Sequence, residues 1–377
     1  MCWFIPDFFC SVVESWHDAP IFSNNFSLCG VSCLLFCCKA VVLNREDAGL
    51  DAVLMRTRNT RVKKQIHSAG ALGVISRGSL GSPIPEFSVV PLDLSGLRQL
   101  LQGPLRWLLP PLLRRQQSLL YVGRLHYPDV MSIAPDAMSM PLLGDYMREE
   151  GIHFALAPGQ VATPKWVNFR TEHIMLMRIN PQWQEFSDYL SDLNSKHRVK
   201  ARRVQAISEP LHFHLLDAAG LNEHRDMLDG LFAGLKQRVP FMLGSLNTRF
   251  FEEQKEYYGD KLHLRLYKVE GKPVGFISLL EEEGTLYALH ACSAPAENKH
   301  LHIYQRMLYD AVDLAISQKC SMLHMGRTAA GIKSSIGAEP VEGHYSVYAR
   351  GILMRFILRI LARWAKPDEE PMRKAFR

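Results

Sequence analysis

The stretch from Leu323 to Pro340, LHMGRTAAGIKSSIGAEP, carries residues well suited to bind an anion. A short apolar run ends at Gly326, Arg327 and Thr328 follow at once, and Lys333 comes six residues after the arginine. Arginine donates two parallel hydrogen bonds to a phosphate or carboxylate, and a nearby lysine adds a second positive charge. The pattern therefore predicts an anion-binding corner at a strand end. The alternative is a plain turn in which Thr328 caps the following helix.

A histidine suited to proton transfer lies in another strand-like run. His290 is near the end of LYALHACS, whose composition is typical of a strand. Because an imidazole titrates near neutral pH, this residue is a candidate to take a proton from an attacking amine. The alternative is an ordinary hydrogen-bonded histidine of the core or the surface.

A dense basic segment follows residue 195. Its members are Lys196, His197, Arg198, Lys200, Arg202 and Arg203. A solvated helix face usually offsets such a run with carboxylates one turn away, yet none occurs between Asp192 and Glu209. We therefore expect the segment, with Lys196, Arg198 and Arg202, to bind an anionic partner: coenzyme phosphates, tRNA or a nucleotide-linked lipid. A solvated face remains the alternative.

Residues 350–366, RGILMRFILRILARWAK, have the pattern of a basic amphipathic helix. Arg355, Arg359 and Arg363 form a stripe with a four-residue repeat. The apolar residues opposite the stripe are Leu353, Phe356, Ile357, Ile360, Leu361 and Trp364. Such helices rest on anionic membrane surfaces, which predicts peripheral attachment to the inner membrane face. The alternative is a C-terminal helix packed on its own domain.

The composition is that of a globular protein. The 377 residues are 47% hydrophobic and 22% charged, and the formal net charge of +6 does not by itself indicate a nucleic-acid binder. Six of the eight cysteines precede residue 40, without a C-x-x-C pair or a matching histidine set. We therefore expect reduced thiols, no metal site and a cytoplasmic location.

One apolar run, FSLCGVSCLLFCCKAVVL at 26–43, is long enough to be considered as a membrane span. It contains Gly30, two serines and Lys39, which favours a buried strand pair or helix instead. No basic residue precedes Lys39, so a signal peptide is not expected.

Strand and helix patterns interleave from residue 86 onward. The expected strands are 87–94, 118–127, 152–159, 172–179, 261–270, 272–282, 284–293 and 320–325. The expected helices are 94–109, 134–151, 181–207, 226–239, 248–259 and 298–318. A three-strand meander, a crossover helix and a further strand predict an α/β fold with a mixed (α+β) sheet. The expected divisions are a poorly patterned region at 1–85, one half at 86–170, a compact domain at 171–349 and the basic helix with its tail at 350–377.

Two stretches resemble one known family. MLMRINPQWQEFSDYLSDLNSKHRVKARR (175–203) and YQRMLYDAVDLAISQKCSMLHMGRTAAGIKSSIGAEP (304–340) are similar to a tandem-domain branch of the GNAT, or acyl-CoA N-acyltransferase, fold. That branch includes FemAB-like peptidoglycan proteins and BioF- and CelD-like acetyltransferases. The resemblance implies two GNAT-like halves, with the functional cleft mostly in the C-terminal one. It also implies that Tyr304 protonates a leaving thiolate or binds substrate. The alternative is that Tyr304 belongs to the apolar face of its helix.

The chain departs from the GNAT pattern at one point. Domains that bind acetyl-CoA usually carry R/Q-x-x-G-x-G/A between the central strand and the next helix, where backbone amides meet the pyrophosphate. The matching stretch here, CSAPAENKHLHIYQRM at 292–307, has no glycine. Anion binding at this helix start would depend on backbone amides together with Asn298, Lys299 and His300. We therefore expect acetyl-CoA to bind weakly.

Three functions fit these features. The leading hypothesis is an N-acyltransferase that moves an acyl group from an acyl-CoA-like thioester to an amine. The second is a FemAB-like aminoacyltransferase that uses aminoacyl-tRNA on a cell-wall or lipid-linked precursor. The third is a binding module that keeps the fold without catalysis.

Overall fold

The computed structural model describes residues 87–92, 117–128, 140–238, 246–364 and 370–376. The apolar run 26–43, the expected helix 94–109 and the six early cysteines lie outside the described residues. Within the described part of the chain, no helix combines the length and the hydropathy needed to cross a membrane.

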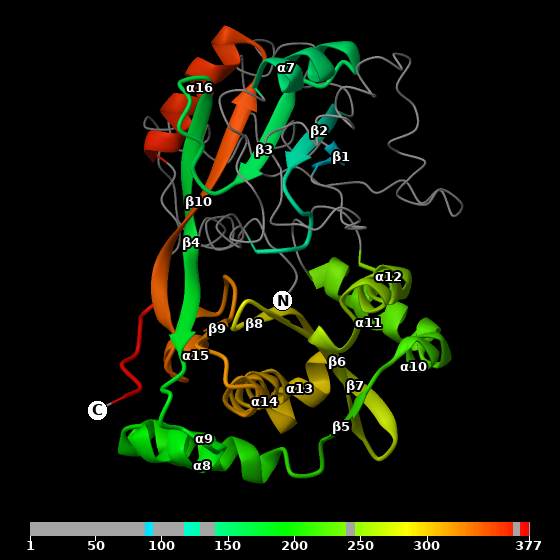
Figure 1. Cartoon of the computed structure of the whole chain (residues 1–377), viewed down its shortest axis with the longest axis vertical. Helices are drawn as coiled ribbons and strands as arrows, with labels where there is room; N and C mark the ends of the chain where they lie inside the picture. The colour runs from blue at the N-terminus through cyan, green and yellow to red at the C-terminus, as the bar shows by residue number, and fades with distance from the viewer. Residues whose placement is uncertain (1–86, 93–116, 129–139, 239–245, 365–369, 377) are drawn as a thin grey trace, which may run out of the picture.

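Ten strands of the described chain form one mixed sheet in the order β1-β2-β3-β10-β4-β9-β8-β7-β6-β5 (Figure 1). The strands are β1 (Phe87–Leu92), β2 (Gln117–Val122), β3 (Phe154–Pro158), β4 (Trp166–Arg178), β5 (His212–Leu215), β6 (Leu262–Val269), β7 (Lys272–Glu282), β8 (Thr285–Ser293), β9 (Met322–His324) and β10 (Glu339–Ala349). The helices are α7 (Met140–Glu149), α8 (Phe186–Asp192), α9 (Ser195–Ile207), α10 (Ala218–Glu223), α11 (Arg225–Arg238), α12 (Thr248–Tyr258), α13 (Pro295–Leu301), α14 (Ile303–Ser317), α15 (Ala330–Ser334) and α16 (Ile352–Trp364). The predicted α/β class is confirmed.

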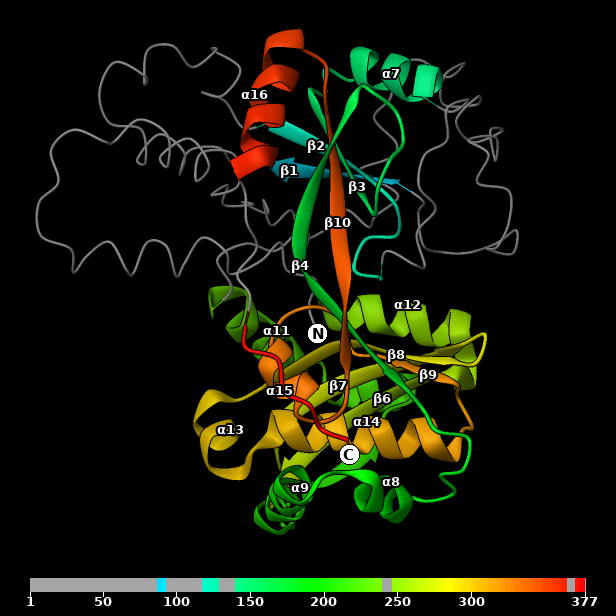
Figure 2. The ribbon, with the colours of Figure 1, turned by 90° about the vertical axis from the view of Figure 1, so that its left-hand side faces the viewer.

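Two long strands join the upper and lower parts of the molecule (Figure 2). β4 has 13 residues and β10 has 11, and the two pair in antiparallel fashion along most of their length. β10 also pairs with β3, and β4 also pairs with β9. The upper part contains β1–β3, α7 and α16, and the lower part contains β5–β9 with the other helices. One sheet therefore runs through both parts.

The expected meander of β6, β7 and β8 is present. Its turns are Glu270-Gly271, with φ of 48° and 76°, and Glu283-Gly284, with φ of 48° and 71°. Two successive positive φ values define the turn type that matches the twist of a hairpin, and glycine adopts them at least cost. The crossover α13–α14 then leads to β9, which is parallel to β8 as expected.

Helices cover both faces of the lower sheet. α14 packs on one face together with α8 and α9, around Ile277, Met307 and Val312. α11 and α12 cover the other face, around Phe251 and Phe276. Because neighbouring residues of a strand point to opposite faces, Phe276 and Ile277 of β7 belong to different cores.

Two expected helices are each divided in the structure, which corrects the sequence-based boundaries. The helix expected at 181–207 breaks at Leu193, which is extended, because the Asn194 side chain accepts the His197 N–H at 3.1 Å and starts α9 anew. The helix expected at 298–318 breaks at His302, which adopts a left-handed conformation with φ of 50°. A periodic apolar pattern continues across both breaks, so periodicity alone does not reveal them.

The last described residues, Glu370–Phe376, lie across the lower part and are called the C-terminal segment below. The Phe376 ring packs against Trp183, with ring centroids 5.7 Å apart, and against Tyr189 at 6.2 Å. A Cβ at Gly337 would collide with the Phe376 ring, so glycine permits this contact. The end of the segment, Ala375 and Phe376, therefore packs on the folded core.

Gly275 in β7 tests how tightly α14 packs on the sheet. An added Cβ would meet the Met307 side chain and would lie 2.9 Å from Cγ2 of Ile303. We expect Gly275→Ala to lower the free energy of unfolding by roughly 1–3 kcal/mol, because the interior has no room for the methyl group. The measurement is denaturant unfolding, with Gly230→Ala in α11 as the control. Gly230 has nothing within 4 Å of the new methyl, so its substitution should be neutral or stabilising.

Candidate functional site

The central feature of the lower sheet is the separation of β8 from β9. The two strands pair in parallel over only three residue pairs, from Thr285↔Met322 to Tyr287↔His324. Beyond that point β9 turns toward β4: the Met325 N–H donates to the Met175 carbonyl at 2.8 Å. β8 meanwhile continues along β7 to Ser293. The sheet therefore opens between the two strands just beyond His324.

A bulge lies in β8 at the same place. Ser278 pairs with His290 and Leu279 pairs with Ala288, so Leu289 has no partner residue in β7. Strict alternation would place His290 and Leu289 on opposite faces, but both lie on the α12 face, where Leu289 joins the core and the His290 ring lies 5.4 Å from the ring of Phe251. Bulges re-aim side chains in this way and recur next to active sites.

His290 is a buried, neutral histidine. Its Nδ1 lies 2.9 Å from Ser278 Oγ, the side chain is only 2% exposed, and Nε2 makes no hydrogen bond of normal geometry within the described chain. Burial lowers the pKa of His290 well below its ordinary value, and the neighbouring His126 lowers it further. A proton transferred to this ring is therefore held only weakly.

His126 is a site residue that the sequence did not single out. It comes from the loop after β2 in the upper part, has φ of 72°, and its ring lies 6.2 Å from that of His290. Burial lowers the pKa of His126 to about 4. The next residue, Tyr127, donates its hydroxyl hydrogen to Gln254 of α12. The upper part of the molecule thus supplies one wall of the histidine site.

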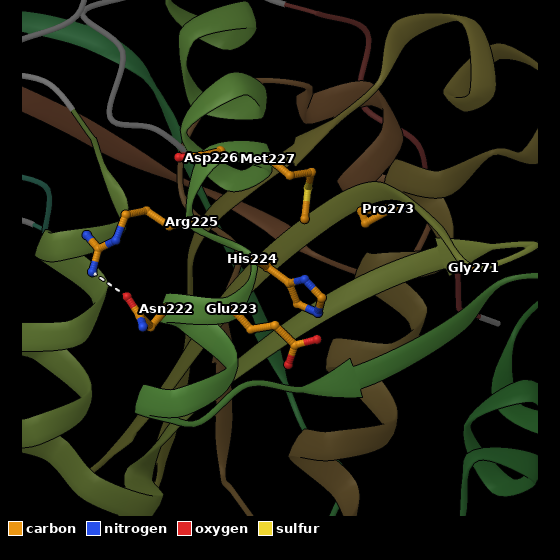
Figure 3. Close-up of a pocket in the computed structure, with 8 residues that line it drawn as sticks. All are labelled: Asn222, Glu223, His224, Arg225, Asp226, Met227, Gly271 and Pro273. Atoms are coloured by element: carbon orange, nitrogen blue, oxygen red, sulfur yellow. Dashed lines mark hydrogen bonds between the residues drawn. The ribbon is translucent and has the colours of Figure 1, made fainter.

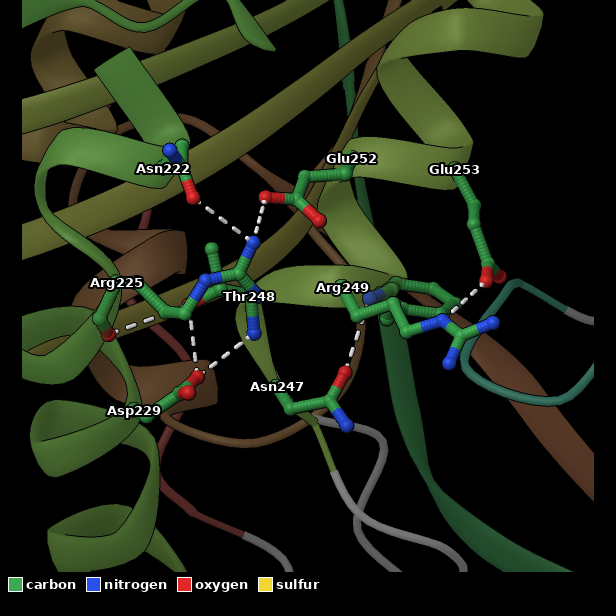
Figure 4. A network of polar contacts seen from close by, with 9 residues as sticks. Asn222, Arg225, Asp229, Asn247, Thr248, Arg249, Glu252 and Glu253 are labelled. Carbon is green, nitrogen blue, oxygen red and sulfur yellow. Dashed lines mark hydrogen bonds and ion pairs between the residues drawn. The ribbon is translucent and has the colours of Figure 1, made fainter. Parts of the chain in front are cut away.

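A polar network holds α12 in place against α10 and α11 (Figure 4). Asp229 Oδ1 accepts both the backbone N–H and the hydroxyl of Thr248, each at 2.7 Å. Arg225 forms an ion pair with Glu252 at 2.5 Å. These contacts fix the start of α12, and with it the aromatic side chains that contact His290.

His324 is the second residue that the sequence analysis missed. It is the last residue of β9, only 2% exposed, and its ring lies 5.4 Å from that of Tyr287, its partner across the last β8–β9 pair. The Gly326 N–H donates to Nδ1 at 3.2 Å, so the neutral ring carries its hydrogen on Nε2. That Nε2–H is buried and has no hydrogen-bond acceptor among the described residues. Burial, and then Lys333, lower the pKa of His324 to about 3.

The predicted anion-binding corner is a strained turn. Gly326, Thr328 and Ala329 have φ of 70°, 62° and 50°. Lys333 is fully buried beneath them, and its ammonium group donates to the carbonyls of Gly326, at 3.3 Å, and of Arg327. Burial lowers the pKa of Lys333 well below its usual value, against the opposing charge of Glu172. Thr328 caps no helix, because α15 begins after Ala329 without a side-chain cap.

Arg327 faces the interior rather than bulk solvent, with 7% of the residue exposed. Its guanidinium carbon lies 4.4 Å from the ring centroid of Tyr345, and its Nη2 donates to the His344 carbonyl at 3.4 Å. A Cβ at Gly343 would lie 2.6 Å from the Glu172 carbonyl oxygen and 3.2 Å from Arg327 Nε, so glycine permits the close approach of β4 to β10 and leaves room for the arginine. Lys333 thus contacts the main chain of Arg327, while the Arg327 side chain packs on Tyr345.

Tyr304 and Asn298 lie on the α14 face. The Tyr304 N–H donates to Asn298 Oδ1 at 2.8 Å, so this side chain caps α14. The Tyr304 hydroxyl is buried without a hydrogen-bond partner in the described chain, and burial, together with Glu370, raises its pKa. Lys299 is exposed on α13.

The basic residues of α9 point mainly outward. Lys196 and Arg202 are exposed, and the half-buried Arg198 donates to the Ser191 carbonyl at 3.1 Å. No cluster of three or more metal-ligating side chains occurs among the described residues.

A separate pocket of about 590 Å³ lies where α10 meets α11 and includes His224, Met227 and Pro273 (Figure 3). Its lining includes Arg225 of the α12 network but none of the candidate histidines and none of the residues of the corner after β9.

The meander, the crossover helix and the diverging parallel pair define a GNAT-like N-acyltransferase fold. A family model for FemAB-like proteins, described as peptidoglycan biosynthesis and recognition, matches residues 160–373. The chain belongs to the FemAB-like family. Membership makes it an acyltransferase by class, as the sequence resemblance implied.

Solved structures of similar proteins have low identity to the chain. FemX is 12% identical, with 74% of this chain and 89% of that one covered and a TM-score of 0.41. L-PGS from Bacillus licheniformis is 16% identical, with 66% and 84% covered and a TM-score of 0.39. A GCN5-related N-acetyltransferase from Kribbella flavida is 13% identical, with 76% and 95% covered and a TM-score of 0.34. No curated protein matches the chain.

The buried histidines make stability depend on pH. The folded-state pKa values of His126 and His324, about 4 and about 3, lie below the ordinary 6.5, so the unfolded chain binds more protons at acid pH. Stability should be fully present above pH 6.5 and fall toward pH 4, by up to about 1.4 kcal/mol per pH unit for each histidine. Denaturant unfolding at several pH values measures this slope. His126→Asn, which tolerates positive φ, should flatten it, whereas His212→Gln on exposed β5 should not; equal slopes in all three proteins would contradict the assignment.

Proposed function

We propose that the chain transfers an aminoacyl-type group from an ester donor to the amine of a cell-wall or lipid-linked precursor. The choice of an ester donor over coenzyme A rests on the backbone amides at the starts of α13 and α14. Pro295 has no N–H to offer a phosphate, and the Tyr304 N–H is already bonded to Asn298 Oδ1. Two of the amide positions at these helix starts are therefore missing or occupied, which weakens the site for the pyrophosphate of coenzyme A. The description of the FemAB-like family supports the cell-wall acceptor.

The proposed reaction takes place where β8 and β9 separate. The acceptor nitrogen attacks the ester carbonyl carbon, a C–N bond forms, the C–O bond to the donor breaks, and the amine proton ends on the departing oxygen. The Nε2–H of His324 is the buried donor suited to the carbonyl oxygen as negative charge develops there. His290 takes the amine proton and passes it on, since burial prevents a stable imidazolium.

In the same proposal, the corner of Arg327 and Lys333 binds an anionic group of the substrate. Arg327 and Lys333 both lie within the interior, next to the end of β9. Lys333 is committed to the backbone carbonyls of the corner, so its role is to hold the turn in shape. Arg327, stacked on Tyr345, is the group that would meet a carboxylate or phosphate of the substrate.

A second proposal concerns location. α16 packs on β4 and β10 through Leu358 and Leu361, yet Ile352, Leu353 and Phe356 are exposed by 78%, 66% and 59%. Helix periodicity puts these three residues near one another at the start of the helix, on a side that continues into the exposed Arg359 and Arg363. This corrects the expected stripe, since Leu353 and Phe356 lie beside the arginines and not opposite them, while Leu358 and Leu361 form the buried side. An exposed apolar group bordered by arginines suits the surface of an anionic membrane, where a lipid-linked acceptor is presented.

Donor preference is tested by calorimetry. We expect acetyl-CoA to bind with a dissociation constant on the order of 1 mM or weaker, and a stable amide-linked aminoacyl-RNA hairpin to bind more tightly. Arg327→Ala should weaken hairpin binding about tenfold without unfolding the chain, because it removes a charged donor. Arg178→Ala, an exposed arginine of β4, is the matched control. Micromolar affinity for acetyl-CoA would show instead that the missing amides do not matter.

Membrane attachment is tested by flotation with vesicles that contain anionic lipid. Replacing Ile352, Leu353 and Phe356 with serine should abolish most flotation, and high salt should reduce it because the charge attraction is screened over about 8–10 Å. The matched control replaces three exposed apolar residues elsewhere, Val199, Leu215 and Val341, with serine. If both triple variants float like the unaltered chain, or if no protein floats at all, α16 serves only to pack on the sheet.

A further inference from the structure

The first turns of α9 gather positive charge at the wrong end of a helix. Lys196, His197 and Lys200 follow the Asn194 cap, and the first turn contains no acidic residue. A helix N-terminus already carries partial positive charge, so lysines there are unfavourable unless an anion is bound nearby. The arrangement needs a counter-charge, and the described chain supplies no carboxylate in an ion pair with these lysines.

The C-terminal segment adds another cation from the far end of the chain. The Arg373 N–H donates to Ser334 Oγ at 3.1 Å, and Asn194 holds the next two residues: its Nδ2 donates to the Lys374 carbonyl at 2.8 Å and its N–H to the Ala375 carbonyl at 2.9 Å. The main chain at Arg373 is thereby fixed between α15 and the start of α9. Its side chain makes no ion pair with a described carboxylate.

Lys200 and α15 complete the cluster. Lys200 Nζ donates to Ser335 Oγ at 3.1 Å, which uses one of its three hydrogens and leaves two for a ligand. Burial, followed by the charge of Arg373, lowers the pKa of Lys200. Lys200 and Arg373 are anchored to neighbouring residues of α15 and its end, since Lys200 bonds to Ser335 and the Arg373 N–H bonds to Ser334.

His197 is a buried polar group among these cations. The residue is 5% exposed, and its Nδ1 has no hydrogen-bond partner in the described chain. Burial, and then Lys200, Lys196 and Arg373 in that order, lower its pKa. An unpartnered ring nitrogen surrounded by positive side chains is the environment that a bound anion with a hydroxyl or water shell would complete.

We propose that Lys196, Lys200 and Arg373, with His197, form a binding site for the phosphate or pyrophosphate group of the donor. α9 contacts both α13 and α14, so the site lies beside the same face as Tyr304. It would supply the charge that the glycine-free start of α13 does not. Mobile lysines and a guanidinium suit the tetrahedral oxygens of phosphate.

That the site holds the donor rests on the proposed function, but phosphate binding itself can be measured without any acyl transfer. The probe is inorganic pyrophosphate, titrated into the full chain by calorimetry at low salt. We expect Arg373→Ala to weaken binding about tenfold, since it removes a charge-assisted contact. Lys374→Ala is the matched control, because it removes the same charge one residue away. Thermal unfolding of each variant checks that the C-terminal segment stays docked.

Coenzyme A and an RNA hairpin with a single-stranded 3′ end then identify the source of the phosphate. Specific loss with Arg373→Ala for either ligand, with Lys374→Ala unaffected, supports the site. No pyrophosphate binding at millimolar concentration, or an equal loss in the two variants, overturns it. If the chain transfers acyl groups but fails this binding test, the proposed function stands and the phosphate site is rejected.

Discussion

The short pairing of β8 with β9 is the constraint on which the rest of the structure depends. After Tyr287 and His324 the two strands follow different neighbours, because β9 bonds to β4 and β8 stays with β7. Beyond this point, the backbone edges of β8 and β9 face each other inside the sheet without pairing. The bulge at Leu289 and the strained corner after His324 both lie next to this separation, and the buried His290 and His324 are beside them.

The opening has two chemically different sides. The α12 face holds the neutral histidines and is closed by His126 from the upper part of the chain. The α14 face holds Tyr304 and lies beside the cations of α9 and the C-terminal segment. Proton transfer requires neutral, weakly basic groups, whereas a charged donor requires cations, and the fold keeps the two apart. The two long strands β4 and β10 hold both parts of the molecule in register.

Local patterns predicted local features well. The Glu-Gly turns, the three-strand meander and the crossover helix follow from residue types within a few positions of one another. His126 and Arg373 could not be found in this way, because His126 reaches His290 from the loop after β2 and Arg373 reaches α15 from the C-terminal segment. His324 had a usable signal, as a titratable residue near the end of the strand expected at 320–325 and two residues before Gly326. The breaks at Leu193 and His302 depend on capping and on a single left-handed residue, which apolar periodicity does not register.

Hydrogen–deuterium exchange tests the central claim most directly, namely that acyl transfer takes place where β8 and β9 separate. The measurement compares the full chain with and without a stable amide-linked aminoacyl-RNA hairpin. The account predicts slower exchange at the backbone amides of 289–293 and of Gly326–Ala329, where the donor would fill the opening between the strands. Protection confined to the pocket of His224 and Pro273, with unchanged exchange at the opening, would contradict it.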